Sequence, residues 1–143
     1  MQSLSSTLQF FLNLSMTQAV IARKFDATLS VHGISFSDFM ILFHLYRSPG
    51  QKLRRIDLSE KVGLSASAVT RKLLPMEKIG LVQRESHARD ARVSFVKLTS
   101  AGINSLENAN ESANQVALEL YYGDEKRLET ITDVLIELGG SFR

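Results

Sequence analysis

Two short helical patterns joined by a tight turn, with two alternating segments directly behind them, constrain the fold of this chain most. Residues 55–64 place apolar side chains on one side of a short helix. Gly63-Leu64-Ser65 is a turn, and Ser65 is well suited to cap a further helix over about residues 66–79. Two short helices around a Gly-containing turn form a helix-turn-helix arrangement.

A charged β-hairpin is predicted immediately after this pair of helices. Gly80 ends the second helix, and residues 81–85 and 92–98 alternate as strands do. In the second strand we expect Val93, Phe95 and Lys97 to share one face. The polar loop between the strands, Ser86-His87-Ala88-Arg89-Asp90-Ala91, predicts a charged hairpin tip.

Longer helices are predicted on both sides of this region. One amphipathic helix covers about residues 5–31, and a second, capped by Ser35 and Asp38, runs to about Arg47 and is apolar on nearly every side. Thr99 caps another helix and Asp124 the last, which Gly139-Gly140 ends. The helix after Thr99 carries a seam suited to a partner, made of Ile103, Leu106, Asn110, Ala113, Ala117 and Leu120.

Composition and charge narrow the classes of function. The chain has 143 residues and no Cys, which excludes disulfides, thiolate nucleophiles and Cys-based zinc sites. Residues 51–98 hold eleven Lys and Arg against five acidic residues, a net charge of +6, whereas residues 99–143 carry −5. One part is therefore suited to a polyanion, although a solvated basic face is the simpler alternative. Apolar runs are too short to span a membrane, and we expect a cytoplasmic protein.

Several short motifs together resemble the MarR family of bacterial transcriptional regulators. They are residues 58–71, residues 76–84, Arg89-Asp90-Ala91-Arg92, and Val96-Lys97-Leu98-Thr99 followed by Gly102. The resemblance covers essentially the whole chain in element order, and its specific motifs lie within residues 53–102.

The resemblance and the element pattern imply a mainly α fold with a small β-hairpin wing. Residues 1–143 would form one chain in which a winged helix-turn-helix, residues 35–98, binds DNA. N- and C-terminal dimerisation helices, residues 5–31 and 99–141, would flank it. The expected partners are double-stranded DNA, with a pseudo-palindromic operator, and a second copy of the chain. The implied function is regulation, most often repression, relieved by a small aromatic or phenolic effector.

The second helix of the helix-turn-helix is the candidate recognition helix. Steps of 100° per residue place Ala66, Val69, Leu73 and Met76 on a core face and small or polar residues opposite. Arg71 is suited to bind guanine, and Arg89 at the wing tip to enter a minor groove. The predicted DNA-binding residues are Ser65, Ser67, Ala68, Thr70, Arg71, Lys72, Arg54, Arg89, Asp90 and Arg92. Alternatively, Ser67 and Thr70 only cap the helix, and Arg71 is a solvated charge.

Three further expectations concern single positions. Asp90 is predicted to hold an arginine in place, either Arg92 or one from the neighbouring helix. Lys52, Arg54 and Arg55 are candidate phosphate contacts, with a solvated cluster as the alternative. Pro75 lies inside the recognition-helix pattern and predicts a kink or a loosened turn at residues 71–75, on the side away from the core.

Other classes of function find less support in the sequence. We predict no enzyme, metal site or cofactor, because the three His are far apart and no phosphate loop or nucleophile elbow is present. Effector-binding candidates are Arg23, His32, Phe39, Phe43 and His44, all of which also suit a core role. A winged-helix module that binds protein, or a carrier of small aromatic acids without DNA binding, are the alternatives. The basic middle segment argues against both.

Overall fold

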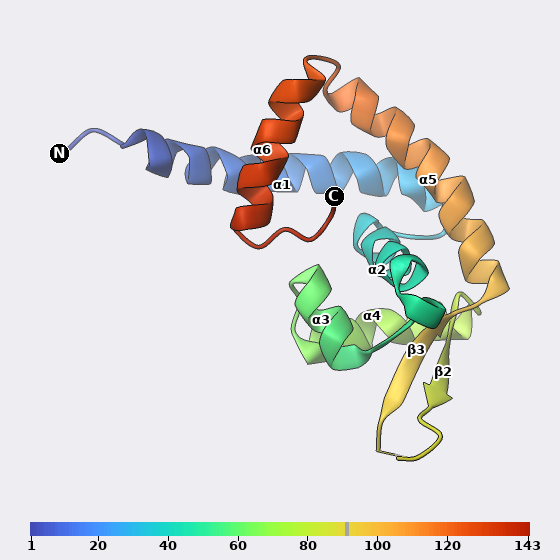
Figure 1. Cartoon of the computed structure of the whole chain (residues 1–143). Coiled ribbons are helices and arrows are strands. Elements are labelled where there is room, and N and C mark those ends of the chain that lie inside the picture. The colour runs from blue at the N-terminus through green and yellow to red at the C-terminus, as the bar shows by residue number, and fades with distance from the viewer. Residues whose placement is uncertain (91) are drawn as a thin grey trace.

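The computed structural model describes residues 1–90 and 92–143 and is mostly helical. A long helix α1 (Ser6–Leu29) and a 3₁₀ turn η1 (Ser30–His32) lead to α2 (Phe36–Arg47). A second 3₁₀ turn, η2 (Pro49–Gln51), then precedes the small sheet and helix-turn-helix region. Figure 1 shows that α1, α5 and α6 occupy one part of the molecule and that α3, α4 and the strands form a separate lobe below α2.

The helix-turn-helix and the hairpin form where the sequence predicts them. They comprise β1 (Lys52–Arg54), α3 (Arg55–Val62), α4 (Ala66–Lys78), β2 (Val82–Ser86) and β3 (Ser94–Leu98). The chain closes with α5 (Ser100–Leu120) and α6 (Glu125–Glu137). Within the predicted hairpin loop, Ala91 lies outside the described residues.

Side-chain caps fix the starts of the helices. Ser35 accepts from the Asp38 amide at 3.1 Å and Asp38 accepts from the Ser35 amide at 3.0 Å, which completes the predicted capping box. Ser65, Thr99 and Asp124 cap α4, α5 and α6, each by accepting from one amide of the first turn. Each of these caps satisfies an amide that the first helical turn leaves unpaired.

The sheet has three antiparallel strands in the order β1-β3-β2, so the hairpin is joined by a strand that the sequence analysis did not predict. Leu53 of β1 lies opposite Val96 of β3, and Val82 of β2 lies opposite Leu98. Val96 and Leu98 are buried. The predicted apolar face of β3 is therefore wrong: the core takes these two residues, and Phe95 and Lys97 lie on the other face.

The core joins α2 to the helices around it. Leu29 of α1, Leu42 of α2 and Leu73 of α4 are fully buried, and the Phe25 and Phe36 rings stack at 4.2 Å between α1 and α2. The side of α5 that is buried within the chain differs from the seam predicted to suit a partner. Its buried side chains include Leu106, Ala109, Ala113 and Val116, whereas Asn110 is half-buried and Ala117 is exposed.

Pro75 does not interrupt α4. The chain stays helical from Ala66 to Lys78, so the predicted loosened turn is absent. The Pro75 ring is exposed, on the side away from the core, as predicted. At this position the missing amide hydrogen removes a bond to the Arg71 carbonyl without opening the helix.

A large apolar surface remains uncovered on α1 and α6. Phe11, Met16 and Val20 of α1 are exposed, and so are Ile131 and Val134 of α6. No residue of α6 is buried. Contiguous apolar surface of this kind marks an interaction site in a folded protein.

Candidate nucleic-acid interface

The α4 helix presents a small polar surface at its start and an apolar face to the core. Val69, Leu73 and Met76 are buried as predicted, but Ala66 is exposed and does not belong to the core face. Ser67 is exposed, and Ala68, which was placed outward, is half-buried. The exposed first turn is therefore narrow enough to approach the edges of bases.

Three hydroxyls at the start of α4 make local hydrogen bonds. Ser65 Oγ accepts from the Ala68 amide at 3.1 Å and lies 3.3 Å from Ser67 Oγ. Thr70 Oγ1 donates to the Ala66 carbonyl at 3.0 Å. Ser65 is therefore the cap, as predicted, whereas neither Ser67 nor Thr70 accepts from an amide of the first turn. These contacts still leave Ser67 at the surface, where its hydroxyl can accept or donate a further hydrogen bond.

Arg71 is an exposed cation in the first half of α4, whereas the Lys72 side chain is half-buried. The Lys72 ammonium lies 3.8 Å from Asp38, the carboxylate of the α2 capping box. Lys72 therefore links α4 to α2 across the lobe. A guanidinium at the position of Arg71 can donate two parallel hydrogen bonds to a guanine edge or to a phosphate.

The basic residues before α3 are partly paired within the chain. Arg54 donates to both carboxylate oxygens of Asp57, at 2.9 and 3.3 Å, and this hydrogen bond raises the pKa of Arg54. The Arg55 guanidinium lies 3.5 Å from Thr70 Oγ1, and its buried Nε has no partner among the described residues. Of the cluster predicted to touch phosphates, Arg54 is the most accessible.

The wing tip is organised by Asp90. Its Oδ1 accepts from the Arg92 amide at 3.0 Å and from Arg92 Nε at 3.3 Å, which selects Arg92 from the two predicted alternatives. The Arg89 amide donates to His87 Nδ1 at 3.1 Å. The Arg89 side chain is exposed. A short tip held by local hydrogen bonds presents its guanidinium with little loss of conformational entropy.

A charged network on the outer face of the sheet escaped the sequence analysis. Glu85 of β2 accepts from Lys52 of β1 at 2.9 Å and lies 3.7 Å from Lys97 of β3. The Lys52 hydrogen bond lowers the pKa of Glu85. Lys52 also sits 4.9 Å from the centre of the Phe95 ring. The signal was hidden because β1 is only three residues long, so its pairing with β3 is a purely tertiary feature.

The five candidate effector residues do not gather in one place. The Phe39 and Phe43 rings on α2 lie 5.9 Å apart, tilted against each other, and the His44 ring lies 4.2 Å from the Phe142 ring. His32 shares a hydrogen bond of 2.8 Å with Ser112 of α5. Arg23 lines a separate cavity of about 440 Å³ between α1 and α5, together with Glu119.

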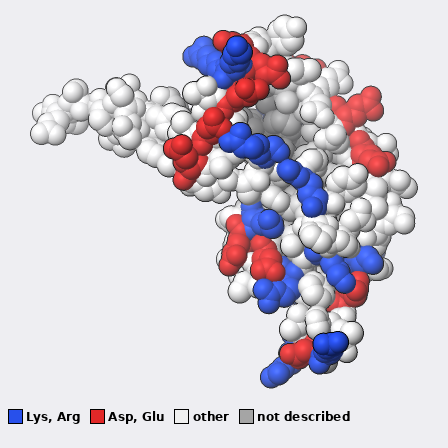
Figure 2. Space-filling view, in the orientation of Figure 1, with Lys and Arg blue, Asp and Glu red and all other residues white. Residues whose placement is uncertain are grey.

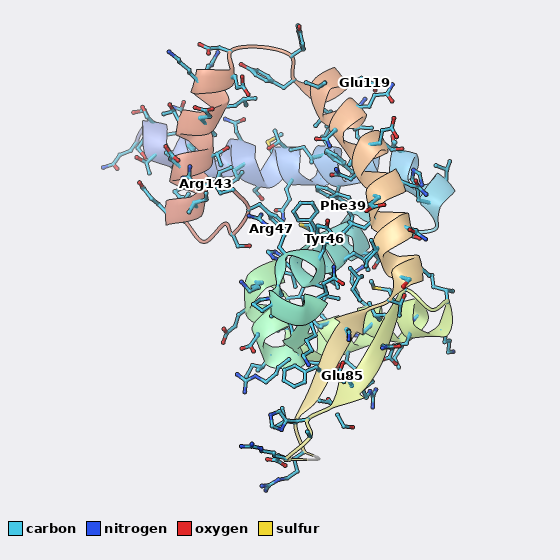
Figure 3. The ribbon with its side chains drawn as sticks, turned by 45° about the vertical axis from the view of Figure 1, so that its right-hand side comes forward. Phe39, Tyr46, Arg47, Glu85, Glu119 and Arg143 are labelled. Carbon is cyan, nitrogen blue, oxygen red and sulfur yellow. The ribbon has the colours of Figure 1, made fainter. Side chains whose placement is uncertain are left out.

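Figure 3 labels Phe39, Tyr46 and Arg47 on α2 and Glu119 on α5, and it labels Glu85 lower down, on the sheet. A second cavity of about 440 Å³ lies between α1 and α2, and its lining includes Ile21, Phe36 and Met40.

In residues 1–90 and 92–143, no cluster of His, Asp and Glu could hold a metal ion. No helix in that part of the chain is both long and apolar enough to span a membrane.

Comparisons with known proteins agree on one kind of relative. Residues 34–94 match the model of the MarR family. The HTH-type transcriptional regulator YdgJ of Bacillus subtilis is 32% identical over 122 residues, 83% of this chain and 70% of that relative.

Solved structures add a likeness of fold. Sco3205, a MarR family transcriptional regulator of Streptomyces coelicolor in complex with DNA, is similar with a TM-score of 0.84 and 18% identity. The match covers 96% of this chain and 89% of Sco3205. An organohalide-sensing transcriptional regulator in its 2,4-dichlorophenol-bound form is similar with a TM-score of 0.81 and 20% identity, over 95% and 80% of the two chains.

Proposed function

The chain belongs to the MarR family of transcriptional regulators, and from that premise we propose that it represses transcription as a homodimer bound to a pseudo-palindromic operator. A small aromatic or phenolic effector would relieve repression. The proposed role is regulatory rather than catalytic. The protein would act in the cytoplasm, where chromosomal DNA is accessible.

The observation that supports DNA binding most is the pair of exposed arginines, Arg71 on α4 and Arg89 at the wing tip. Both belong to the lobe that lies away from α1 and α6 in Figure 1. Figure 2 shows acidic side chains gathered over α6, and Lys and Arg side chains, with acidic ones among them, over the other lobe down to the wing. The basic side chains are in excess there, because residues 51–98 hold eleven Lys and Arg against five acidic residues. A polyanion would therefore be attracted to the lobe formed by residues 35–98.

Each predicted residue has a distinct part in this proposal. Arg71 contacts a base edge in the major groove, and Arg89 enters the adjoining minor groove. Asp90 holds the Arg92 side chain, which contacts a phosphate. The remaining predicted contacts are Ser65, Ser67, Ala68, Thr70, Lys72 and Arg54. Their hydroxyls can reach phosphates or bases, Arg54 and Lys72 can pair with phosphates, and the small Ala68 side chain lets the helix approach.

We propose that α1, α5 and α6, within residues 5–31 and 99–141, form the dimer. Exposed apolar residues on α1 and α6 supply the surface. Two winged lobes related by a two-fold axis would then contact half-sites about 10 bp apart.

The effector is proposed to occupy the cavity of about 440 Å³ between α1 and α2. That volume suits a small aromatic molecule, and Phe36 lines the cavity while stacking 6.3 Å from Phe39. Binding there would shift α2 relative to α1 and change the distance between the two recognition helices. The ligand named for the organohalide-sensing neighbour, 2,4-dichlorophenol, is a reasonable first probe.

Selection on random duplex DNA tests the proposal. We expect an enriched inverted repeat whose affinity falls steeply as salt rises, because lysine and arginine release counterions from phosphates. Arg71→Ala and Arg89→Ala should lose most specific binding and keep the dimer. Arg127→Ala, at an exposed arginine of α6, is the matched control and should bind as the unchanged protein does.

Three outcomes would contradict the proposal, and the last two would each favour one alternative function. Retention of DNA without an enriched repeat would contradict sequence-specific binding. Absence of retention at low salt, also after unfolding and refolding to strip a carried ligand, would point to a module that binds protein. Tight binding of an aromatic acid without DNA retention would instead indicate a carrier.

A further inference from the structure

The segment after α6 folds back across the molecule instead of continuing outward. Gly139 adopts φ +124°, a conformation that L side chains rarely adopt, and the Gly140 amide donates to the Leu135 carbonyl at 2.8 Å. This reversal sends residues 141–143, which we name the strap, toward the winged lobe. Figure 1 shows the C end of the chain between α6 and the pair formed by α2 and α3.

Phe142 is the centre of the strap. Its ring lies 4.2 Å from the His44 ring and 5.9 Å from the Phe43 ring, measured between centres. Phe142 is half-buried, and His44 beneath it is 5% exposed. Burial of an aromatic ring against two others contributes both apolar contact and ring-ring attraction.

Polar contacts hold the residues on either side of Phe142. Ser141 Oγ donates to the Lys61 carbonyl of α3 at 2.9 Å and lies 3.3 Å from His44 Nε2. Arg47 of α2 donates to the Arg143 carbonyl at 3.2 Å. The strap therefore touches both helices that support the recognition helix, and Figure 3 shows Arg47 and Arg143 on the two sides of this junction.

The other end of the strap is anchored on α6. The Arg143 guanidinium forms an ion pair with Asp133, about one turn before the end of α6. Because α6 has no buried residue, its own packing fixes its orientation only weakly. The α5–α6 turn holds one end of α6, and the strap holds the other end against α2 and α3.

We propose that the strap sets the angle between α6 and the winged lobe, with Phe142 as the positioning residue for operator binding. The inference rests on the proposed function, in which α6 belongs to the dimer. In a dimer built on α1 and α6, this angle fixes the separation of the two α4 helices. If the strap were released, only a fraction of the dimers would have the separation of the two α4 helices that the operator requires. The apparent affinity for the operator falls in proportion to that fraction.

Phe142→Ala is the variant that tests the strap. We expect it to lose about tenfold in affinity for the best operator, because few molecules keep the competent spacing. It should also tolerate operators with one base pair added or removed between half-sites better than the unchanged protein. Affinity for random DNA at low salt should stay the same, since Arg71 and Arg89 are untouched.

Two further variants separate positioning from folding. Phe142→Tyr keeps the ring and should restore both affinity and spacing preference. Tyr122→Ala removes a ring that is 91% exposed in the α5–α6 connection and serves as the matched control. Unfolding midpoints of the three variants should be compared, because a merely destabilising change would lower affinity at every spacing alike.

A readout without DNA keeps the test decisive. The chain has no Cys, so labels can be attached at Lys78→Cys on α4 and Glu129→Cys on α6, with excess unlabelled chain to isolate one labelled copy. With Phe142 in place, we expect a narrow distribution of the distance between the two labels. When Phe142→Ala is added, we expect a broad distribution of the same distance. A narrow distribution in that variant, or an unchanged spacing preference, would overturn the strap. If the unchanged protein selects no operator, the proposed function fails, and the distance measurement alone decides the strap.

Discussion

At the scale of single residues, Thr99 and Gly102 explain why a short motif joins the hairpin to α5. Thr99 caps α5 by accepting from the Gly102 amide at 3.0 Å, and the Thr99 hydroxyl lies 3.0 Å from the Leu81 carbonyl. Gly102 is buried against that carbonyl. A Cβ at position 102 would lie 2.1 Å from the Leu81 oxygen. The motif thus ties the start of α5 to the start of β2.

Gly102→Ala should therefore destabilise the protein. The added methyl group meets backbone rather than a flexible side chain, and overpacking of this kind costs about 1–3 kcal/mol. Urea denaturation followed by circular dichroism would measure the loss. Asn108→Ala at an exposed position of α5 is the control, expected within about 0.5 kcal/mol of the unchanged protein. Equal stability of the two variants would contradict the close approach.

His44 makes stability depend on pH. Burial, with Lys61 and Arg47 nearby, lowers the pKa of His44 below its ordinary value of 6.5. Below about pH 6.5 the unfolded chain takes up a proton that the folded chain resists, so the free energy of unfolding falls as pH falls. Denaturation midpoints at several pH values between 7.5 and 5.5 would show this decline. In His44→Gln the decline should be shallower, and an identical slope would argue against His44.

Some site residues could be predicted because their signals are local. Ser65 and Asp90 act within three residues of themselves, through a helix cap and a tight turn. The partner of Lys72 within the chain could not be predicted, because Asp38 lies on another helix. The same holds for Ser141, whose contacts with Lys61 and His44 span most of the chain. Periodicity shows which face a residue takes but not what lies opposite it.

At the scale of elements, the long helices follow from periodicity and caps, whereas the sheet depends on tertiary pairing. The α1 and α2 helices begin and end within two residues of their predicted bounds. The β1 strand was missed because its three residues, Lys52–Arg54, have no pattern of their own. The β3 face was misassigned because Phe95 is apolar yet packs beside Lys52 and His87 on the outer face.

At the same scale, Pro75 lowers the stability of the α4 helix. Proline in a helix interior costs about 3 kcal/mol relative to alanine. It also restricts the unfolded chain, which offsets roughly 1 kcal/mol of that difference. Pro75→Ala restores an amide that can donate to the Arg71 carbonyl, and it should raise the free energy of unfolding by about 1–2 kcal/mol. Chemical denaturation checks this, and a lowered stability would mean that the ring makes favourable contacts at the surface.

At the scale of the whole molecule, charge and apolar surface are separated between the two ends. Acidic side chains gather over α6 in Figure 2, whereas residues 51–98 of the winged lobe carry a net charge of +6. The apolar surface of α1 and α6 lies at the same end as these acidic side chains, where Leu12, Met16 and Leu138 are exposed. A chain that hides its apolar face against a copy of itself leaves the basic lobes free, and this arrangement would let two recognition helices face one DNA duplex.

Phe11→Glu on α1 should disrupt this association. Phe11 is 42% exposed, and a carboxylate there would be buried without a partner in the dimer, which is strongly unfavourable. Light scattering after size exclusion should give twice the 16.0 kDa of one chain for the unchanged protein and a value near one chain for the variant. Asn108→Glu adds the same charge at an exposed site of α5 and should leave the mass unchanged. Because a single lobe contacts a single half-site, the monomeric variant should also lose its preference for an inverted repeat. A variant that stays dimeric would place the interface elsewhere than on α1.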